Sequence, residues 1–311
     1  MSVDLVMIQV MTRSFLIRPL GAFSLRESAV FGFGQRMPVG RRAGSADDGF
    51  DGVMRLAFCL DGYTDQVGVE LRQDDAGVHG VAHGAGDLDA VRRQVARCLS
   101  LDHDGRDFEP VGRRDPVIGR LQQAAPGLRP PLFYSPYEAA AWSVLSARRP
   151  AAQTAQVRTR LSRAWGRTFE LAGEPLAALP TPRQLLELTD FPGIPSDRIK
   201  RLHGVAQAAL RGLLDADRLF RLGPVVAASE VQRIKGIGPF YASLIVIRGT
   251  GFTDVLVPDE SRSLDLIRQL YGLADLPSPG ELEELAEPWR PFRTWCTVLI
   301  RAAGHRVLAS S

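Results

Sequence analysis

Cysteine, histidine and long hydrophobic runs are scarce in this chain of 311 residues, and each scarcity excludes a class of protein. The three cysteines, Cys59, Cys98 and Cys296, are far apart and cannot form the four-cysteine cluster of an iron–sulfur site. Their odd number favours a reducing compartment. The five histidines show no metal-binding spacing. We therefore expect no catalytic metal and no cofactor.

The chain also lacks an apolar run of membrane-spanning length, and its first residues lack the pattern of a signal peptide. These two absences predict a cytoplasmic protein without membrane contact. We expect residues 1–13 to form a loosely ordered N-terminus.

Lysine is nearly absent too, since only Lys200 and Lys235 occur. Almost all of the basic charge is therefore arginine, and the formal net charge is +3. Codon bias of a GC-rich genome explains this choice well. Whatever its cause, the high arginine content favours binding to phosphate, because the planar guanidinium suits phosphate groups.

The first third of the chain shows strand patterns. Short, partly alternating stretches rich in Val, Leu and Phe are separated by turns that carry Gly and Asp, which predicts an antiparallel sheet. A helical spacing of apolar residues follows in DLDAVRRQVARCLSL. We therefore predict a β domain with one helix over residues 14–110. The predicted strands are in SFLIRPL, GVMRLAFCL, QVGVELRQ and AGVHGVAHG.

Strand patterns nearly disappear after Pro110, and helical patterns joined by short Gly- and Pro-rich connections replace them. Ser135 is a candidate N-cap for a helix that begins at Pro136 or Tyr137, and the following helix is expected to end at Gly166. The predicted fold class is α+β, with a small antiparallel β domain before an all-α body over residues 111–311. The further predicted helices are in TPRQLLELTDF, SDRIKRLHGVAQAALRG, SEVQRIKG, PFYASLIVIRG, RSLDLIRQLYG, SPGELEELAEP and PFRTWCTVLIRAAG.

The stretch IKGIGPFYA joins two predicted helices through two glycines. Ser229 and Gln232 fit a capping box, so we expect a short helix from Ser229 to Lys235. Pro239 suits the first position of the next helix, and Ile237 is expected to anchor the turn in the core. The free amides of such a turn, near the positive end of a helix dipole, make an anion site. A tight connection that needs glycine only for its own geometry is the alternative interpretation.

Two adjacent carboxylates, Asp259 and Glu260, lie downstream in VPDES, just before a predicted helix. A carboxylate near a gripped phosphodiester backbone suggests chemistry on an extruded nucleotide. The competing interpretation is acidic charge that complements the dipole at the helix N-terminus.

Together these motifs resemble the helix-hairpin-helix superfamily of DNA glycosylases, and most closely the bacterial 3-methyladenine DNA glycosylase II type. The likeness covers nearly the whole chain from about Ser14. The resemblance implies helical subdomains with a groove between them. It rests on IKGIGPFYASLIVIRGTGFTDVLVPDE, with support from LRPPLFYSPYEAAAWSVLSARR, FPGIPSDRIKRLHGVAQAAL and EPWRPFRTWCTVLIRAA.

The resemblance implies a catalytic carboxylate that falls on Glu260, where the type has aspartate, and makes Asp259 the second choice. Lys235 and the amides of Gly236, Ile237 and Gly238 are then expected to contact a DNA phosphate. The resemblance also implies a structural Na⁺ or K⁺ at the hairpin carbonyls.

The expected base pocket departs from the type, which holds aromatic residues at several of these positions. At the end of the helix that contains Trp142, Arg148 and Arg149 replace the family's glutamine and apolar wedge, and are expected to contact DNA or to be solvated surface. The resemblance maps the pocket onto Phe240, Leu244 and Arg301, and Trp142 and Trp295 are further candidates.

The predicted function is therefore a monofunctional DNA glycosylase that excises a damaged base, first of all an alkylated purine, from double-stranded DNA in base excision repair. Bifunctional members of the superfamily have a lysine nucleophile where this chain has Phe240, so no lyase activity is expected. We expect a monomer in the cytoplasm, associated with the nucleoid. A non-catalytic DNA-binding member and a glycosylase for another lesion, such as a deaminated base, are the alternatives.

Overall fold

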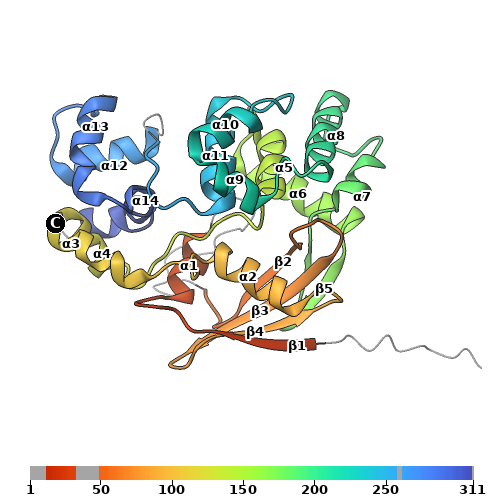
Figure 1. The fold of residues 1–311 in the computed structure, drawn as a ribbon, viewed down its shortest axis with the longest axis horizontal. Coiled ribbons are helices and arrows are strands. Elements are labelled where there is room, and N and C mark those ends of the chain that lie inside the picture. Colours follow the sequence, from red (N-terminus) through yellow and green to blue (C-terminus); the bar gives the residue numbers. More distant parts are fainter. Residues whose placement is uncertain (1–11, 33–48, 258–260, 310–311) are drawn as a thin grey trace, which may run out of the picture.

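The computed structural model describes residues 12–32, 49–257 and 261–309. A four-stranded antiparallel sheet with strand order β1-β4-β3-β2 forms the N-terminal part, as predicted (Figure 1). The ring of Phe15 in β1 packs on Gly80 of β4, where an added Cβ would lie 2.1 Å from that ring. The strands are β1 Thr12–Ile17, β2 Met54–Cys59, β3 Gln66–Asp74 and β4 Gly77–His83.

Two helices accompany this sheet. The predicted helix is α2 (Leu88–Cys98), and its apolar face contributes Val91 and Val95 to the core that it shares with the strands. The sequence analysis missed α1 (Leu25–Phe31), which Ser24 caps by accepting a hydrogen bond from the Glu27 amide. The expectation of a loosely ordered segment over residues 1–13 lies mostly outside the described residues, although Thr12 and Arg13 belong to β1.

The prediction of an all-α remainder is wrong in one place. A hairpin of two short strands, β5 (Thr168–Leu171) and β6 (Glu174–Ala177), follows the helix that ends before Gly166. It packs on the main sheet because Gly68 leaves room for the ring of Phe169, which an added Cβ would approach to 2.7 Å. The β5–β6 hairpin, from the helical half of the chain, therefore covers part of the main sheet.

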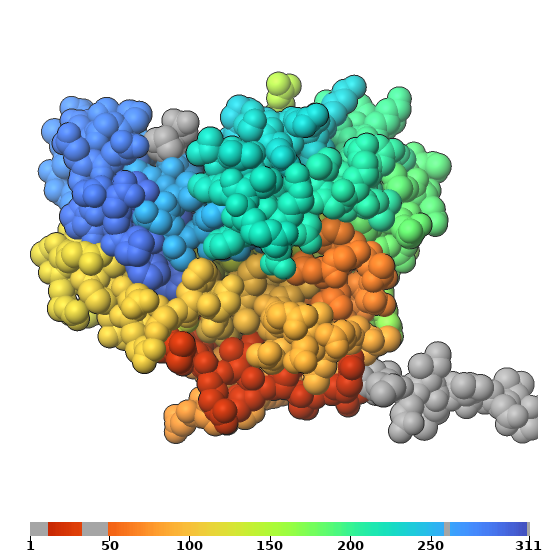
Figure 2. All heavy atoms as spheres, in the orientation of Figure 1, coloured from red at the N-terminus to blue at the C-terminus, as the bar shows by residue number. Residues whose placement is uncertain are grey.

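The remaining helices form two packed clusters, which lie side by side along the sheet domain (Figures 1 and 2). The first helical cluster comprises α5 Pro136–Ser146, α6 Ala151–Trp165, α7 Pro182–Leu186, α8 Ser196–Leu210, α9 Ala216–Leu222, α10 Pro224–Val231 and α11 Pro239–Thr250. The second helical cluster comprises η1 Gly105–Asp107, α3 Glu109–Arg114, α4 Pro116–Ala124, α12 Ser261–Tyr271, α13 Pro279–Leu285, η2 Glu287–Trp289 and α14 Arg293–Leu308.

The second helical cluster is built from two separate parts of the chain. The chain passes through α3 and α4, crosses to the first helical cluster, and crosses back before α12. Helix α14 packs on α4, and Arg306 donates a hydrogen bond to the carbonyl of Ala124. The predicted domain boundary at residue 110 lies inside α3. The two crossing segments, residues 125–135 and 251–257, therefore run between the clusters.

A buried polar group fixes the second helical cluster. The carboxylate of Asp115 caps α4 by accepting bonds from the amides of Val117 and Ile118. Its other oxygen accepts from the Tyr271 hydroxyl at 2.5 Å and from the Trp289 indole at 2.7 Å. Buried polar groups hold a structure firmly when all are satisfied, so Asp115 ties α4, α12 and η2 together.

The helix boundaries around the predicted hairpin differ from our expectation. Ser229 does not begin a helix but lies inside α10, which starts at Pro224 with Gly223 as its N-cap and ends at Val231. The error arose because Ser229 and Gln232 imitate a capping box in a helix that Pro224 had already started. Ser135 and Pro239 do occupy the predicted cap and first positions of α5 and α11.

Candidate active site

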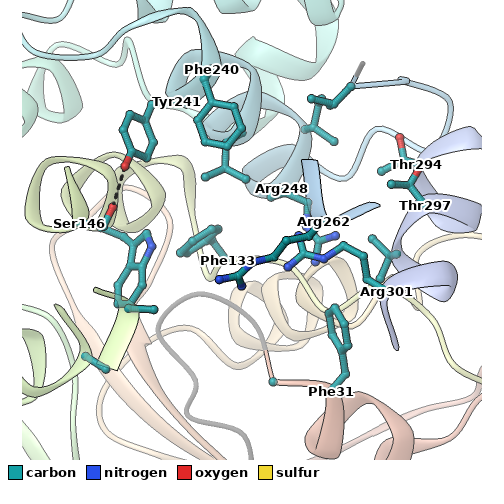
Figure 3. A pocket seen from close by; sticks show the side chains of 18 of the residues that line it. Phe31, Phe133, Ser146, Phe240, Tyr241, Arg248, Arg262, Thr294, Thr297 and Arg301 are labelled. Atoms are coloured by element: carbon teal, nitrogen blue, oxygen red, sulfur yellow. Dashed lines mark hydrogen bonds between the residues drawn. The ribbon is translucent and has the colours of Figure 1, made fainter. Parts of the chain in front are cut away.

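A cavity of about 800 Å³ lies between the two helical clusters (Figure 3). This size is within the range of small-molecule sites. Its walls come from the first helical cluster, the second helical cluster, both crossing segments and the end of α1. The lining residues are Phe31, Gly32, Phe133, Trp142, Ser146, Arg149, Pro150, Ala151, Ala152, Ala155, Phe240, Tyr241, Leu244, Ile247, Arg248, Val255, Val257, Arg262, Thr294, Thr297, Val298 and Arg301.

The turn between α10 and α11 is the predicted hairpin. Ile237 is buried and its amide donates to the carbonyl of Ile234 at 3.0 Å, which closes the turn. Lys235, Gly236 and Gly238 are exposed beside it. As at any helix start, the first amides of α11 lack an acceptor within the helix. The turn therefore presents backbone donors and one lysine at the surface.

The two glycines of the hairpin differ in what requires them. Gly236 has φ +95°, and an added Cβ would lie 2.8 Å from Cδ of Arg201. Gly238 has φ −86° and ψ 176°, which any residue adopts, and an added Cβ would have nothing within 4 Å. Backbone conformation requires glycine at 236, whereas Gly238 serves as the N-cap of α11 and leaves a bare backbone that faces open space.

The turn after α5 carries the two predicted arginines. Arg148 is exposed and has φ +54°, a left-handed conformation that costs a non-glycine residue roughly 1 kcal/mol. Arg149 lines the cavity and donates to the carbonyl of Gly193 at 2.8 Å. Arg198, which the sequence analysis did not single out, holds this turn by donating to the carbonyls of Leu145 and Ala147.

Aromatic faces cover much of the cavity wall. Of the predicted pocket residues, Phe240, Leu244 and Trp142 line the cavity, and Phe240 is 49% exposed. Tyr241 lies against Phe240 and hydrogen-bonds Ser146 at 3.3 Å.

Other aromatic positions differ from the prediction. Phe31 and Phe133 also line the cavity, although no sequence motif marked them. Trp295 does not; it is buried between Phe108 and Phe292, with ring centroids 5.2 and 5.0 Å away. Its place on the inner side of α14 explains this, since that side packs into the second helical cluster.

Arginine side chains form the polar part of the wall. Figure 3 shows Arg248, Arg262 and Arg301 gathered between Phe240 and Phe31. Arg248 is buried on α11 and donates to the carbonyl of Pro131 in the first crossing segment. The predicted pocket residue Arg301 reaches the cavity from α14, and Arg262 from the first turn of α12.

The predicted carboxylates Asp259 and Glu260 lie outside the described residues. The described residues on either side of them, Val257 and Arg262, both line the cavity. Upstream, the chain is fixed to the start of α14, because Thr294 donates to the carbonyl of Val255 and accepts from its amide, both at 2.9 Å. The second crossing segment is therefore anchored at the cavity before it reaches residue 258.

Asp254 strengthens this anchor. It accepts from Nε of Arg293 at 2.8 Å and from Nη1 of Arg290 at 3.1 Å. Partial burial alone would raise the pKa of Asp254, but the hydrogen bonds and positive charge of Arg293, with Arg290, outweigh it and lower the pKa. Asp254 is thus held ionised in a structural role.

The sequence of the chain is similar to those of DNA-3-methyladenine glycosylases. The chain is 22% identical over 211 residues to DNA-3-methyladenine glycosylase of Bacillus subtilis, covering 67% of this chain and 70% of that protein. It is 29% identical over 190 residues to DNA-3-methyladenine glycosylase 2 of Escherichia coli, covering 59% of this chain and 63% of that protein, which is less than two thirds. No protein-family model matches the chain.

Solved structures agree on the fold. A 3-methyladenine DNA glycosylase from Archaeoglobus fulgidus has a TM-score of 0.72 at 19% identity and covers 93% of this chain and 96% of its own. An 8-oxoguanine glycosylase/lyase from Clostridium acetobutylicum has a TM-score of 0.63 at 16% identity, with 94% and 98% covered. The chain has the helix-hairpin-helix glycosylase fold. Its sequence resembles the 3-methyladenine DNA glycosylase II type, as predicted.

The cysteines, the possible metal ligands and the apolar helices of the described residues are considered next in this fold. Burial raises the pKa of the Cys59 and Cys296 thiols well above the usual value, so these cysteines are core residues. The described residues hold no group of three or more His, Cys, Asp or Glu side chains placed to share a metal ion. No described helix has both the length and the apolar composition needed to cross a membrane.

The alkali-metal ion that the resemblance implies at the hairpin stays a prediction. Two of the carbonyls at this turn already accept backbone bonds, that of Ile234 from the Ile237 amide and that of Gly238 from the Ala242 amide. Each carbonyl oxygen has a second lone pair, so these bonds do not fill the turn.

Proposed function

We propose that the protein is a DNA glycosylase that flips a damaged base out of duplex DNA into the cavity and hydrolyses its N-glycosidic bond, as a first step of base excision repair. One observation carries the proposal. The cavity lies between the hairpin helix α11 and the chain that leads to Asp259 and Glu260. Its aromatic walls suit a flipped base, which enzymes of this kind read by stacking and edge contacts.

The hairpin is proposed to hold the DNA backbone. Lys235 and the amides of the Gly236–Gly238 turn would bind a phosphate, helped by the positive end of α11. The bare backbone at Gly238 supports this, because a side chain there would meet no part of the described chain but would obstruct an approaching phosphate. Such a contact is independent of base sequence.

Arg148 is proposed to enter the duplex where the flipped base leaves a gap. Strained backbone conformations persist at functional sites, and Arg148 is an exposed, left-handed residue on the turn held by Arg198. A guanidinium plane stacks on aromatic rings, so arginine could replace an apolar wedge. Arg149, the neighbouring residue, lines the cavity and would face the nucleotide itself.

The chemical step needs one carboxylate. We assign it to Glu260, with Asp259 as the second choice, from the ungapped spacing of the resemblance. The ionised carboxylate would position water and stabilise the positive charge on the sugar as the C1′–N bond breaks. Water supplies hydroxide to C1′ and a proton to the departing base, so the products are free base and an abasic site.

Lyase activity would need an amine nucleophile at the cavity, and we propose that this protein has none there. Phe240 stands where bifunctional members have lysine, and the described cavity lining contains no lysine. Lys235 is exposed on the other side of the turn. The solved 8-oxoguanine glycosylase/lyase shows that this fold also accommodates lyases, so the exclusion must be tested directly.

The test is release of free base from duplexes that each contain one lesion. The set includes 7-methylguanine, 3-methyladenine, hypoxanthine, uracil and 8-oxoguanine. We expect one or more bases to be released, with the strand left intact until alkali cleaves the abasic site. Cleavage without alkali would show lyase activity. DNA binding with no base released from any duplex would favour a non-catalytic DNA-binding protein.

A further inference from the structure

The cavity contains four arginines from four separate elements, and two of them, Arg149 and Arg248, also donate to backbone carbonyls. Arg149 follows α5, Arg248 lies on α11, Arg262 on α12 and Arg301 on α14. The described lining contains no lysine, histidine, aspartate or glutamate. Arginine stays charged at any physiological pH.

Two carboxylates, at Asp259 and Glu260, would not cancel this charge even if both faced the cavity. If both Asp259 and Glu260 faced the cavity and were ionised, they would contribute −2 against +4 from the arginines, which leaves +2. This count does not depend on which partners the arginines have. Among the described residues, a base that enters the cavity therefore meets a positively charged wall.

Arg262 is the arginine that the fold explains least. It lies in the first turn of α12, where the helix dipole disfavours a positive charge by a few tenths of a kcal/mol. Its side chain is exposed and lines the cavity. Neutralising it should not destabilise the helix, so its charge serves something other than local stability.

The hydrogen-bonding groups of the wall are mostly donors. A guanidinium has five N–H donors and no acceptor. The hydroxyl protons of Thr294 and Thr297 already go to the carbonyls of Val255 and Arg293, both at 2.9 Å, so the donors of the wall come chiefly from the arginines. A well-matched base would therefore offer acceptors such as carbonyl oxygens.

We infer that the cavity selects uncharged damaged bases that carry carbonyl oxygens and disfavours the cationic purines produced by alkylation of a ring nitrogen. This inference rests on the proposed function and names its substrate class. The aromatic walls stack on a base of either kind, so they do not oppose it. Uncharged alkylated bases remain compatible with it.

Two 6-oxopurines provide the test, because hypoxanthine is uncharged in DNA and 7-methylguanine is cationic. Single-turnover base release from otherwise identical duplexes is divided by the uncatalysed release rate, since the cationic base leaves faster unaided. We expect the wild type to accelerate hypoxanthine release more. Arg262→Gln should reduce this preference by roughly 10-fold, the size expected for one partly screened charge. Arg268→Gln, on the same helix but outside the cavity lining, should leave it unchanged.

The outcomes separate the two proposals. Greater acceleration for 7-methylguanine would overturn the inference while the glycosylase assignment stands. An unchanged preference in Arg262→Gln, with uniformly weaker binding of both duplexes, would also overturn it, because Arg262 would then hold phosphate. If the wild type released neither these bases nor any other lesion, the glycosylase assignment itself would fail and the inference with it. Thermal unfolding confirms that each variant is folded.

Discussion

The two sides of the cavity differ in chemistry. The first helical cluster contributes mainly flat or apolar side chains, and the second contributes mainly charges and hydroxyls. A flat face binds bases of every kind, whereas charges and donors distinguish one base from another. The first side contributes Trp142, Phe240, Tyr241 and Leu244, and the second contributes Arg262, Thr294, Thr297 and Arg301. The flat faces that stack on a base thus lie mainly on the first side, whereas the cavity arginines come from both sides, since Arg149 and Arg248 belong to the first.

The two sides also differ in how they are stabilised. The second helical cluster joins two distant chain segments around Asp115, Tyr271 and Trp289. Trp289 is fully buried, so Trp289→Ala should lower the free energy of unfolding by about 3–5 kcal/mol. Urea unfolding measures this. Trp142→Ala is the matched control, because Trp142 is only half-buried at the cavity wall. A loss below about 1 kcal/mol for Trp289→Ala would contradict the role given to this cluster.

The first side is tested by the same control variant in base release. Trp142→Ala should reduce single-turnover release by roughly 10- to 100-fold, since stacking on an aromatic contributes about 1–3 kcal/mol per base. The reduction should be the same for hypoxanthine and 7-methylguanine. A change in their ratio would show that this wall also selects, which would remove the division between the two sides.

The hairpin belongs to the first side and should affect DNA affinity alone. Gly238→Val should weaken binding to damaged and undamaged duplexes alike, on the order of 10-fold for one lost charge-assisted contact. Its stability should fall by no more than about 1 kcal/mol, the cost of valine at the N-cap of α11, because the added side chain meets nothing in the described chain. Gly280→Val is the matched control: an added Cβ there also meets nothing within 4 Å, but Gly280 lies on α13, outside the hairpin and the cavity lining. Equal DNA affinities of Gly238→Val and Gly280→Val would show that the hairpin does not contact DNA.

The anchor of the second side has a pH signature. The pKa of Asp254 is lowered below its ordinary 3.8, so the stability from its bonds to Arg290 and Arg293 is present above that value and is lost as pH falls through the folded-state pKa. Asp254→Asn should cost about 1–2 kcal/mol at neutral pH. The difference between variant and wild type should shrink in acid. A difference that stays constant as the pH is lowered through the acid range would mean that packing, not the ionised carboxylate, forms the anchor.

Sequence patterns predicted the parts of the fold that local chemistry determines. The cap at Ser135, the helix start at Pro239, the buried Ile237 and the four main strands follow from residues within a few positions of one another. The missed β5–β6 hairpin has four-residue strands, too short to show alternation, and depends on packing over Gly68.

The site was less predictable because it forms where the chain crosses between clusters. Phe31 and Phe133 come from different parts of the chain and carry no motif, so only the packed structure brings them to the cavity. Trp295 shows the converse. An aromatic residue on a helix has two faces to choose from, and the sequence pattern around Trp295 did not distinguish the cavity side from the core side.

The central claim is that a carboxylate beside the cavity performs base excision. Single-turnover release on the lesion that the wild type processes best, measured for Glu260→Gln and Asp259→Asn with DNA affinity measured in parallel, tests it most directly. Our account predicts that Glu260→Gln lowers release by about 1,000-fold or more, with affinity nearly unchanged and Asp259→Asn retaining activity. Loss of activity in Asp259→Asn but not in Glu260→Gln would move the assignment by one residue. Full activity in both variants would contradict the claim.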